Sequence, residues 1–60
     1  MKVPVDFGDK KLREVELFHT FAYGKEIYRS HIITHPISKK PCYVEYDPDT
    51  GEITVKEVEA

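Results

Sequence analysis

Polar and apolar residues alternate most regularly near the carboxyl end of the chain. Residues 42–46, CYVEY, and residues 52–56, EITVK, both alternate, and the run DPDTG separates them. Pro48 fits the first corner of a type I turn, and Gly51 supplies a residue that adopts the left-handed conformation easily. The pattern predicts a β-hairpin with Glu45, Thr54 and Lys56 toward water and an apolar face of Cys42, Val44, Tyr46, Ile53 and Val55.

A second hairpin is predicted around Gly24, which fits the first corner of a tight turn. The strand before it places Val15, Leu17, His19, Phe21 and Tyr23 on one face. A two-residue turn at Gly24 and Lys25 sets Tyr28 opposite Phe21 and Ile32 opposite Leu17, which makes that face continuous and apolar. Phe18 falls on the other face, so we expect this strand to bend or bulge there.

Together these signals predict an all-β protein with five strands in an antiparallel meander. The sheet is expected to be strongly twisted or to form a small half-open barrel. The expected strands cover residues 2–7, 11–23, 26–35, 42–47 and 52–58.

One alternative is an α+β fold, with a helix over about residues 10–23 packed on a four-stranded sheet. Asp9 would cap this helix and Gly24 would end it. Leu17, Phe21 and Tyr23 would spread its apolar arc over more than half of the helical wheel, which is too wide for a helix that covers one thin sheet. We therefore favour the strands.

The chain length indicates one small domain, residues 1–60, with a marginal hydrophobic core. Domains of this size usually need a disulfide, a metal ion or a second copy for stability. The single cysteine, Cys42, cannot form an internal disulfide. Self-association as a homodimer is therefore expected.

The charge balance argues against a protein that coats nucleic acid without sequence specificity. Nine Lys and Arg residues stand against eleven Asp and Glu residues, for a net charge of −2, whereas proteins that grip phosphates usually carry a basic surplus. The chain has no Asn and no Gln, a composition that favours a heat-adapted protein. With one cysteine, no apolar leader and no run of about 20 apolar residues, we expect a cytoplasmic protein without a membrane span.

The run HIITHPISKKPC holds two histidines and the cysteine, and it raises the question of a metal site. On a strand, His31 and His35 lie about 13 Å apart, too far to share a zinc ion. His19 comes opposite His31 only if the turn at Gly24 has three residues; Cys42 or Glu16 would then be a third ligand. We expect no metal and no cofactor.

Catalysis is not expected either. Cys42 opens a strand on the apolar face, where a free cysteine usually acts as a small hydrophobic residue. The three glycines lie far apart, so no phosphate-binding loop is present. A chain this small also lacks the walls that exclude water from an active site.

The expected binding residues are aromatic and basic: Tyr28, Arg29, Lys39, Lys40 and Tyr43. The sequence favours a non-catalytic binding module that contacts another protein, or a second copy of itself, through a sheet face or edge. The alternative is a small β domain that binds RNA or single-stranded nucleic acid by stacking bases on these rings.

Overall fold

The computed structural model describes residues 1–58, and this part of the chain contains no helix. The prediction of an all-β antiparallel protein is confirmed. The helix considered for residues 10–23 is excluded, because two strands occupy this segment. The seven strands are β1 (Lys2–Asp6), β2 (Leu12–Glu16), β3 (Phe18–Ala22), β4 (Lys25–Arg29), β5 (Ile33–Thr34), β6 (Pro41–Tyr46) and β7 (Ile53–Glu57).

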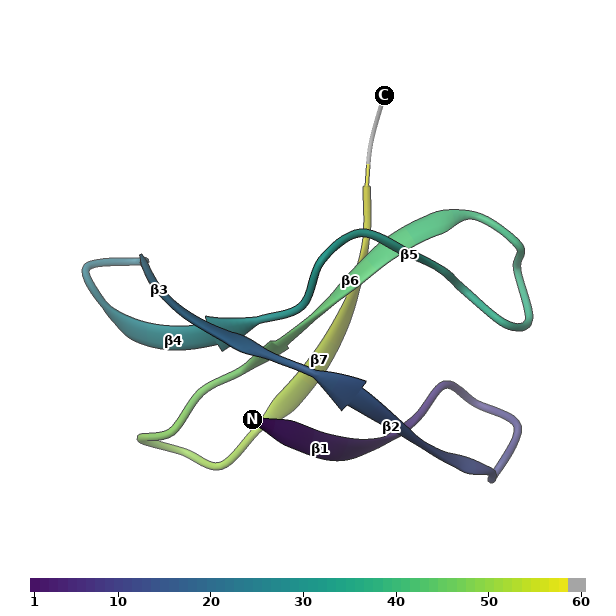
Figure 1. Ribbon diagram of the computed structural model, residues 1–60, viewed down its shortest axis with the longest axis horizontal. Coiled ribbons are helices and arrows are strands. Elements are labelled where there is room, and N and C mark those ends of the chain that lie inside the picture. The colour runs from purple at the N-terminus through teal and green to yellow at the C-terminus, as the bar shows by residue number, and fades with distance from the viewer. Residues whose placement is uncertain (59–60) are drawn as a thin grey trace.

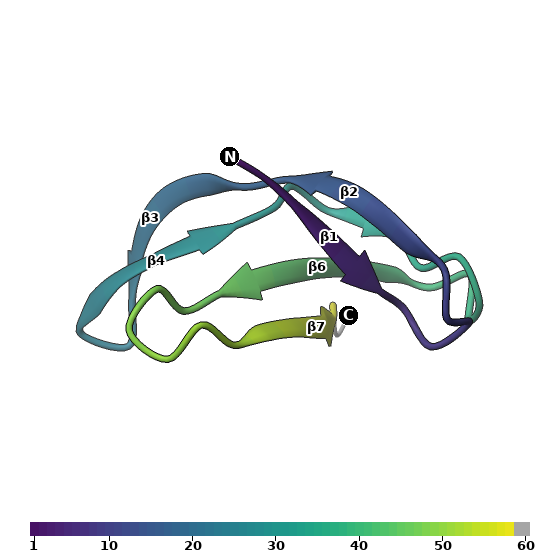
Figure 2. The same cartoon turned by 90° about the horizontal axis from the view of Figure 1, so that it is seen from below.

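The strands follow the predicted meander, with two of its five strands broken in the middle. β1 pairs with β2, β3 with β4, both β4 and β5 with β6, and β6 with β7, always antiparallel. Leu17 alone separates β2 from β3, and residues 30–32 separate β4 from β5 (Figure 1). The sheet curls into the predicted half-open barrel, whose arched section is clear in Figure 2.

The break between β4 and β5 is a bulge built on Ser30. Three residues, 30–32, separate the paired positions on this side, whereas only Tyr43 and Val44 separate them on β6. The Ser30 amide donates to the Val44 carbonyl at 2.9 Å, and the Ser30 hydroxyl accepts from the Val44 amide at 2.8 Å. The hydroxyl thus takes the place of a ladder carbonyl that the extra residue has displaced.

The core lies between the β1–β2 hairpin and one face of the larger sheet. Cys42 is fully buried there, and burial, with a smaller contribution from the charge of Glu57, raises the pKa of its thiol. Cys42 therefore behaves as the small buried apolar residue that its place on the strand predicted. The buried members of this core are Val5, Phe7, Val15, Leu17, Cys42 and Val44.

The predicted register around Gly24 is wrong by two residues. The turn consists of Tyr23 and Gly24, both in the left-handed region with φ of 56° and 74°, which is the requirement of a type I′ turn. His19 therefore pairs with Tyr28, and Phe21 pairs with Glu26. A slip of two keeps the side chains of β3 and β4 on their expected faces, but it moves Phe21 to the end of the sheet. Tyr23 falls in the turn, and its hydroxyl reaches Glu45 on the other face. Ile32, expected opposite Leu17, lies in the break after β4 and is 59% exposed.

The predicted carboxyl-terminal hairpin is confirmed. Val44 pairs with Val55, which places both on one face of the sheet, as the alternation predicted. In the turn, the Asp47 carboxylate accepts from the Asp49 amide at 2.9 Å, and Gly51 adopts a φ of 77°. Residues 1–58 contain no helix long and apolar enough to cross a membrane.

Candidate functional site

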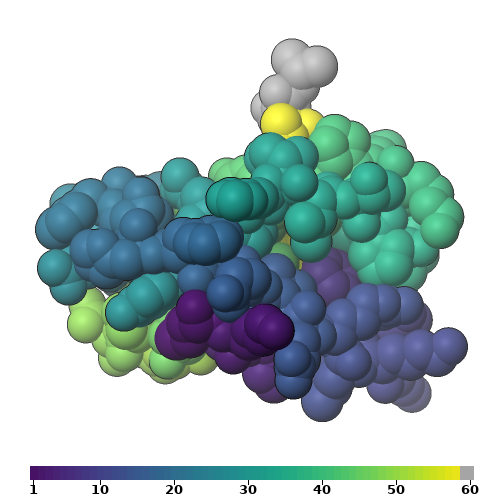
Figure 3. All heavy atoms as spheres, viewed as in Figure 1, coloured from purple at the N-terminus to yellow at the C-terminus, as the bar shows by residue number. Residues whose placement is uncertain are grey.

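A slot opens between β2 and the segment that carries β5. The two strands β3 and β4 stay paired as far as Phe18 and Arg29, and beyond this pair β2 and β5 separate. The resulting slot has a volume of about 490 Å³. Figure 3 shows it as a hollow between the blue residues of β2 and the green residues of the β5–β6 hairpin.

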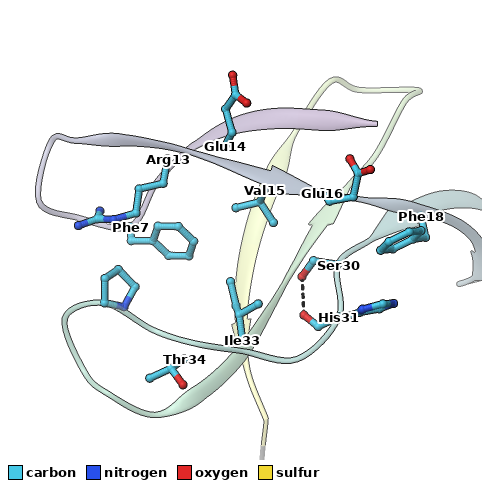
Figure 4. A pocket seen from close by; sticks show the side chains of 11 residues that line it. Phe7, Arg13, Glu14, Val15, Glu16, Phe18, Ser30, His31, Ile33 and Thr34 are labelled. Atoms are coloured by element: carbon cyan, nitrogen blue, oxygen red, sulfur yellow. Dashed lines mark hydrogen bonds between the residues drawn. The ribbon is translucent and has the colours of Figure 1, made fainter.

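The floor of the slot is apolar, and aromatic pairs stand at its two ends. Val15 from β2 and Ile33 from β5 lie on opposite sides of the slot, next to Phe7 (Figure 4). At the closed end, the rings of Phe18 and His31 stack with centroids 4.5 Å apart. At the other end, Phe7 meets the ring of His35 edge-on at 5.4 Å. The slot therefore offers contact area to apolar side chains.

The edge of β2 that borders the slot carries backbone groups without a strand partner. Leu17 and Met1 exchange two hydrogen bonds, of 2.6 and 3.0 Å. Because bonded and non-bonded pairs alternate in an antiparallel ladder, the backbone groups of Glu14 and Glu16 must point away from β1, toward the slot. Pro4, which has no amide hydrogen, lies opposite Glu14 and fits this alternation.

The edge of β5 faces the slot in the same way. The amide of His35 donates to the carbonyl of Lys40 at 2.9 Å, so these two residues form a bonded pair. By alternation, Ile33 is bonded to β6, whereas the amide and carbonyl of Thr34 point toward the slot. Two strand edges with open hydrogen-bonding groups therefore border one apolar floor.

In the part of the chain that the structure describes, some of the charged side chains around the slot have an ion-pair partner, and one does not. The guanidinium of Arg13 lies 2.8 Å from the Asp9 carboxylate and, chiefly through this hydrogen bond, lowers the pKa of Asp9 to about 2. Glu16 lies 3.4 Å from the amino terminus. Within residues 1–58 no cation lies within ion-pair distance of Glu14, whose side chain points away from the floor (Figure 4).

The opposite face of the sheet carries a compact cluster around Glu45. The sequence predicted that Glu45 faces water, yet only 6% of this residue is exposed. Its carboxylate accepts hydrogen bonds from Arg29 Nε at 2.8 Å and from the Tyr23 hydroxyl at 3.1 Å, and Lys56 Nζ lies 2.9 Å away. The prediction for Glu45 is wrong because the three partners reach it from neighbouring strands, which the alternation of one strand does not show.

The electrostatics of this cluster favour the ionised carboxylate. Burial raises the pKa of Glu45, but the hydrogen bonds from Lys56, Arg29 and Tyr23 together outweigh it, so that the pKa lies below its usual range. The pKa of Lys56 is raised by its hydrogen bond to the Tyr23 hydroxyl and then by that to Glu45, and the pKa of Arg29 is raised by its hydrogen bond to Glu45. Both cations are thus already neutralised within the protein.

The five binding residues predicted from the sequence lie in three places. Arg29 and Tyr43 come together, with the guanidinium carbon 5.2 Å from the ring centroid. Tyr28 lies on the other face, partly packed against the core. Lys39 and Lys40 are exposed in the loop between β5 and β6. The structure therefore does not gather the five into one surface.

The histidines have separate surroundings. His19 lies 3.6 Å from Glu26 and pairs across the ladder with Tyr28, not with His31. Nδ1 of His35 accepts hydrogen bonds from the amides of Ile37 and Ser38, at 3.1 and 3.2 Å, and so holds the loop after β5. Within residues 1–58, no three side chains of His, Cys, Asp or Glu come together as ligands for a metal ion.

The sequence did not identify the slot. Its one usable signal was Phe18, which breaks the alternation and predicted a bend where β2 leaves the sheet. The separation of β5 from β2 has no comparable signal, since it depends on the bulge at Ser30 and on the β1–β2 hairpin covering the core.

Comparisons of the chain with protein-family models, with curated proteins and with solved structures each found no match. The fold and the slot are therefore the basis for the function.

Proposed function

We propose that this protein is a non-catalytic binding module that holds an extended segment of a partner protein in the slot, as an added strand beside β2. The observation that carries this proposal is the pair of open strand edges on either side of an apolar floor. An extended polypeptide satisfies both features, because its backbone pairs with an edge while alternate side chains reach the floor.

The spacing of the groups on β2 matches such a ligand. The backbone groups of Glu14 and Glu16 repeat every second residue, about 6.6 Å along the strand. A partner strand presents its own hydrogen-bonding groups at the same interval. The apolar side chains of the partner strand would then contact Val15, Phe7 and Ile33. They reach this floor from the residues that lie between those bonded to Glu14 and Glu16.

Charge indicates what the outward side chains of the segment are. Glu14 and Glu16 project from the outer face of β2, and Glu14 is opposite a proline, not a cation. Residues opposite one another on neighbouring strands favour unlike charges. The partner segment is therefore an alternation of apolar residues with Lys or Arg.

A synthetic peptide that alternates Val and Lys over seven residues tests the proposal. The control is a peptide of the same composition with its valines in one block. In ¹⁵N spectra the alternating peptide is expected to shift the amide signals of residues 13–17 and 32–35 and to slow the hydrogen exchange of Glu14 and Glu16. The control peptide should do neither. Equal shifts from both peptides would show simple charge attraction and would overturn the proposal.

Two substitutions at position 14 distinguish the contribution of the backbone amide to peptide binding from that of the side chain. Glu14→Pro removes an amide that points to the slot and leaves the bonds to β1 in place, since proline is tolerated on an edge with its nitrogen outward. Glu14→Ala removes the same carboxylate but keeps the amide. Glu14→Pro is expected to weaken the peptide about tenfold more than Glu14→Ala, as loss of one hydrogen bond of about 1.4 kcal/mol requires. Equal affinities of the two variants would exclude strand addition at β2.

A further inference from the structure

Aromatic side chains form a row across the four strands β3, β4, β6 and β7, beyond the part of the sheet that the β1–β2 hairpin covers. Tyr46 pairs with Ile53 on one side and with Tyr28 on the other, and Tyr28 pairs with His19. Paired residues share a face. We call this set the aromatic row: His19, Phe21, Tyr28, Tyr46 and Ile53.

The members of the row touch one another and are open to solvent at both ends. The ring centroids of Tyr28 and Tyr46 are 6.2 Å apart, and His19 meets Tyr28 at 5.7 Å and Phe21 at 5.6 Å. Phe21 is 69% exposed and Ile53 is 39% exposed. The row thus crosses the sheet from the exposed Phe21 on β3 to the exposed Ile53 on β7, through the half-buried rings of Tyr28 and Tyr46.

The charges next to the row disfavour a polyanion. The cations of these strands, Lys25, Arg29 and Lys56, lie on the other face, and each is already paired with a carboxylate. Two carboxylates lie on the row's own side of these strands: Glu26, opposite Phe21, and Glu57, opposite Cys42 at the far end of β7. Bases stack well on such rings, but a nucleic acid also needs cations for its phosphates.

We propose that the aromatic row is the contact surface of a reversible homodimer, in which two copies pack row against row about a two-fold axis. A two-fold contact requires a surface that complements itself, and a row without Lys, Arg, Asp or Glu meets this condition. The axis runs across the row, so that Phe21 of one copy packs on Ile53 of the second. This orientation keeps the two Glu26 carboxylates at opposite ends. The dimer is independent of the slot and of the segment bound there.

The amount of exposed apolar surface supports a second copy as the occupant. In residues 1–58, nine large apolar residues are exposed and only seven apolar residues are buried, and a dimer through the row covers two of the nine, Phe21 and Ile53. A standard interface buries about 800 Å² on each partner, roughly a fifth of the 4306 Å² of surface in this molecule. Of the large apolar members of the row only Phe21 and Ile53 are exposed, so we expect a reversible dimer with a dissociation constant in about the micromolar range.

Sedimentation equilibrium of the full chain, from about 10 μM to 1 mM, tests the dimer with two matched variants. Phe21→Glu places a charge in the row, and Leu12→Glu places the same charge on β2, outside the row, at a residue that is 70% exposed. Phe21→Glu is expected to raise the dissociation constant at least tenfold, while Leu12→Glu leaves it within twofold. Because both residues are exposed, both variants should remain folded.

The contacts themselves provide a second measurement. Filtered NOE spectra of a mixture of labelled and unlabelled chains are expected to show contacts between Phe21 of one copy and Ile53 of the other. A monomer at 1 mM, or a dimer that Phe21→Glu leaves intact, would overturn the proposal. So would binding of a thymidine 20-mer to the monomer that weakens steeply with salt and is lost in Phe21→Glu, because the row would then serve nucleic acid.

Discussion

The two faces of β6 are stabilised by different forces, although their residues alternate along one strand. On the inner face, Cys42 and Val44 are fully buried among apolar side chains. On the outer face, Glu45 is nearly as buried, but hydrogen bonds and ion pairs from neighbouring strands hold it. Apolar burial does not depend on the protonation of a side chain, whereas the outer cluster depends on pH and is weakened when salt screens its charges. A domain with one thin core therefore adds a second, polar layer to the same sheet.

The largest expected loss of stability comes from a substitution on the inner face. Val44→Ala removes two buried methyl groups and leaves a small cavity, which should lower the free energy of unfolding by about 2 kcal/mol and the melting temperature by roughly 10 °C. Chemical denaturation at pH 7 and pH 4 measures this loss, which should be the same at both. The control Thr54→Ala, at an exposed position on β7, should stay within about 0.5 kcal/mol of the parent. A loss that changes with pH would contradict an apolar origin.

A smaller effect is expected on the outer face, and this one depends on pH. Glu45→Gln leaves Arg29 and Lys56 without an anion; since both are about one-third exposed, the expected cost at pH 7 is about 1 to 2 kcal/mol. The folded pKa of Glu45 is depressed below 4.5. The contribution of the Glu45 carboxylate to the free energy of unfolding is therefore complete above pH 4.5, the pKa of this group in the unfolded chain. It is lost as the pH falls through the lower pKa of the folded protein.

Denaturation of the parent and of Glu45→Gln from pH 7 down to about pH 2 measures this dependence. The two stability curves should converge in acid, since the protonated carboxyl and the amide are both neutral. Curves that remain parallel over the whole range would show that the carboxylate charge does not stabilise the sheet.

The smallest effect concerns the hydroxyl of Tyr23. Tyr23→Phe keeps the ring but removes the hydrogen bond to Glu45, at an expected cost of about 0.5 to 1 kcal/mol. In a double-mutant cycle with Glu45→Gln, the two losses should be less than additive, because the residues share one network. Strictly additive losses would show that Tyr23 and Glu45 are not energetically coupled.

The alternation along each strand was sufficient to predict the class of fold and most of the faces. The carboxyl-terminal hairpin appeared as expected because its turn residues and both flanking patterns agree on one register. Around Gly24 the local signals did not agree: a glycine fits either corner of a tight turn, and only the left-handed conformation of Tyr23 selects the second. The consequence is that Phe21, expected opposite Tyr28, lies at the end of the sheet.

The slot and the aromatic row could not be predicted in the same way. The slot requires β2 to leave the sheet after Leu17 and the bulge at Ser30 to turn β5 away from it. The row requires the β1–β2 hairpin to cover only one part of a sheet face. Both depend on which surfaces far apart in the sequence come together. Of the expected binding residues, only Tyr28 belongs to the row, and none lies on the floor of the slot.

The sequence by itself determined an antiparallel β-protein and the side of the sheet on which most residues lie, because side chains point alternately to the two faces of any extended strand. The tertiary structure decided how far each strand remains paired, which apolar residues are covered and which carboxylate is buried among cations. These outcomes depend on contacts between strands that are far apart in the sequence. Such contacts form only when the whole sheet closes around its core.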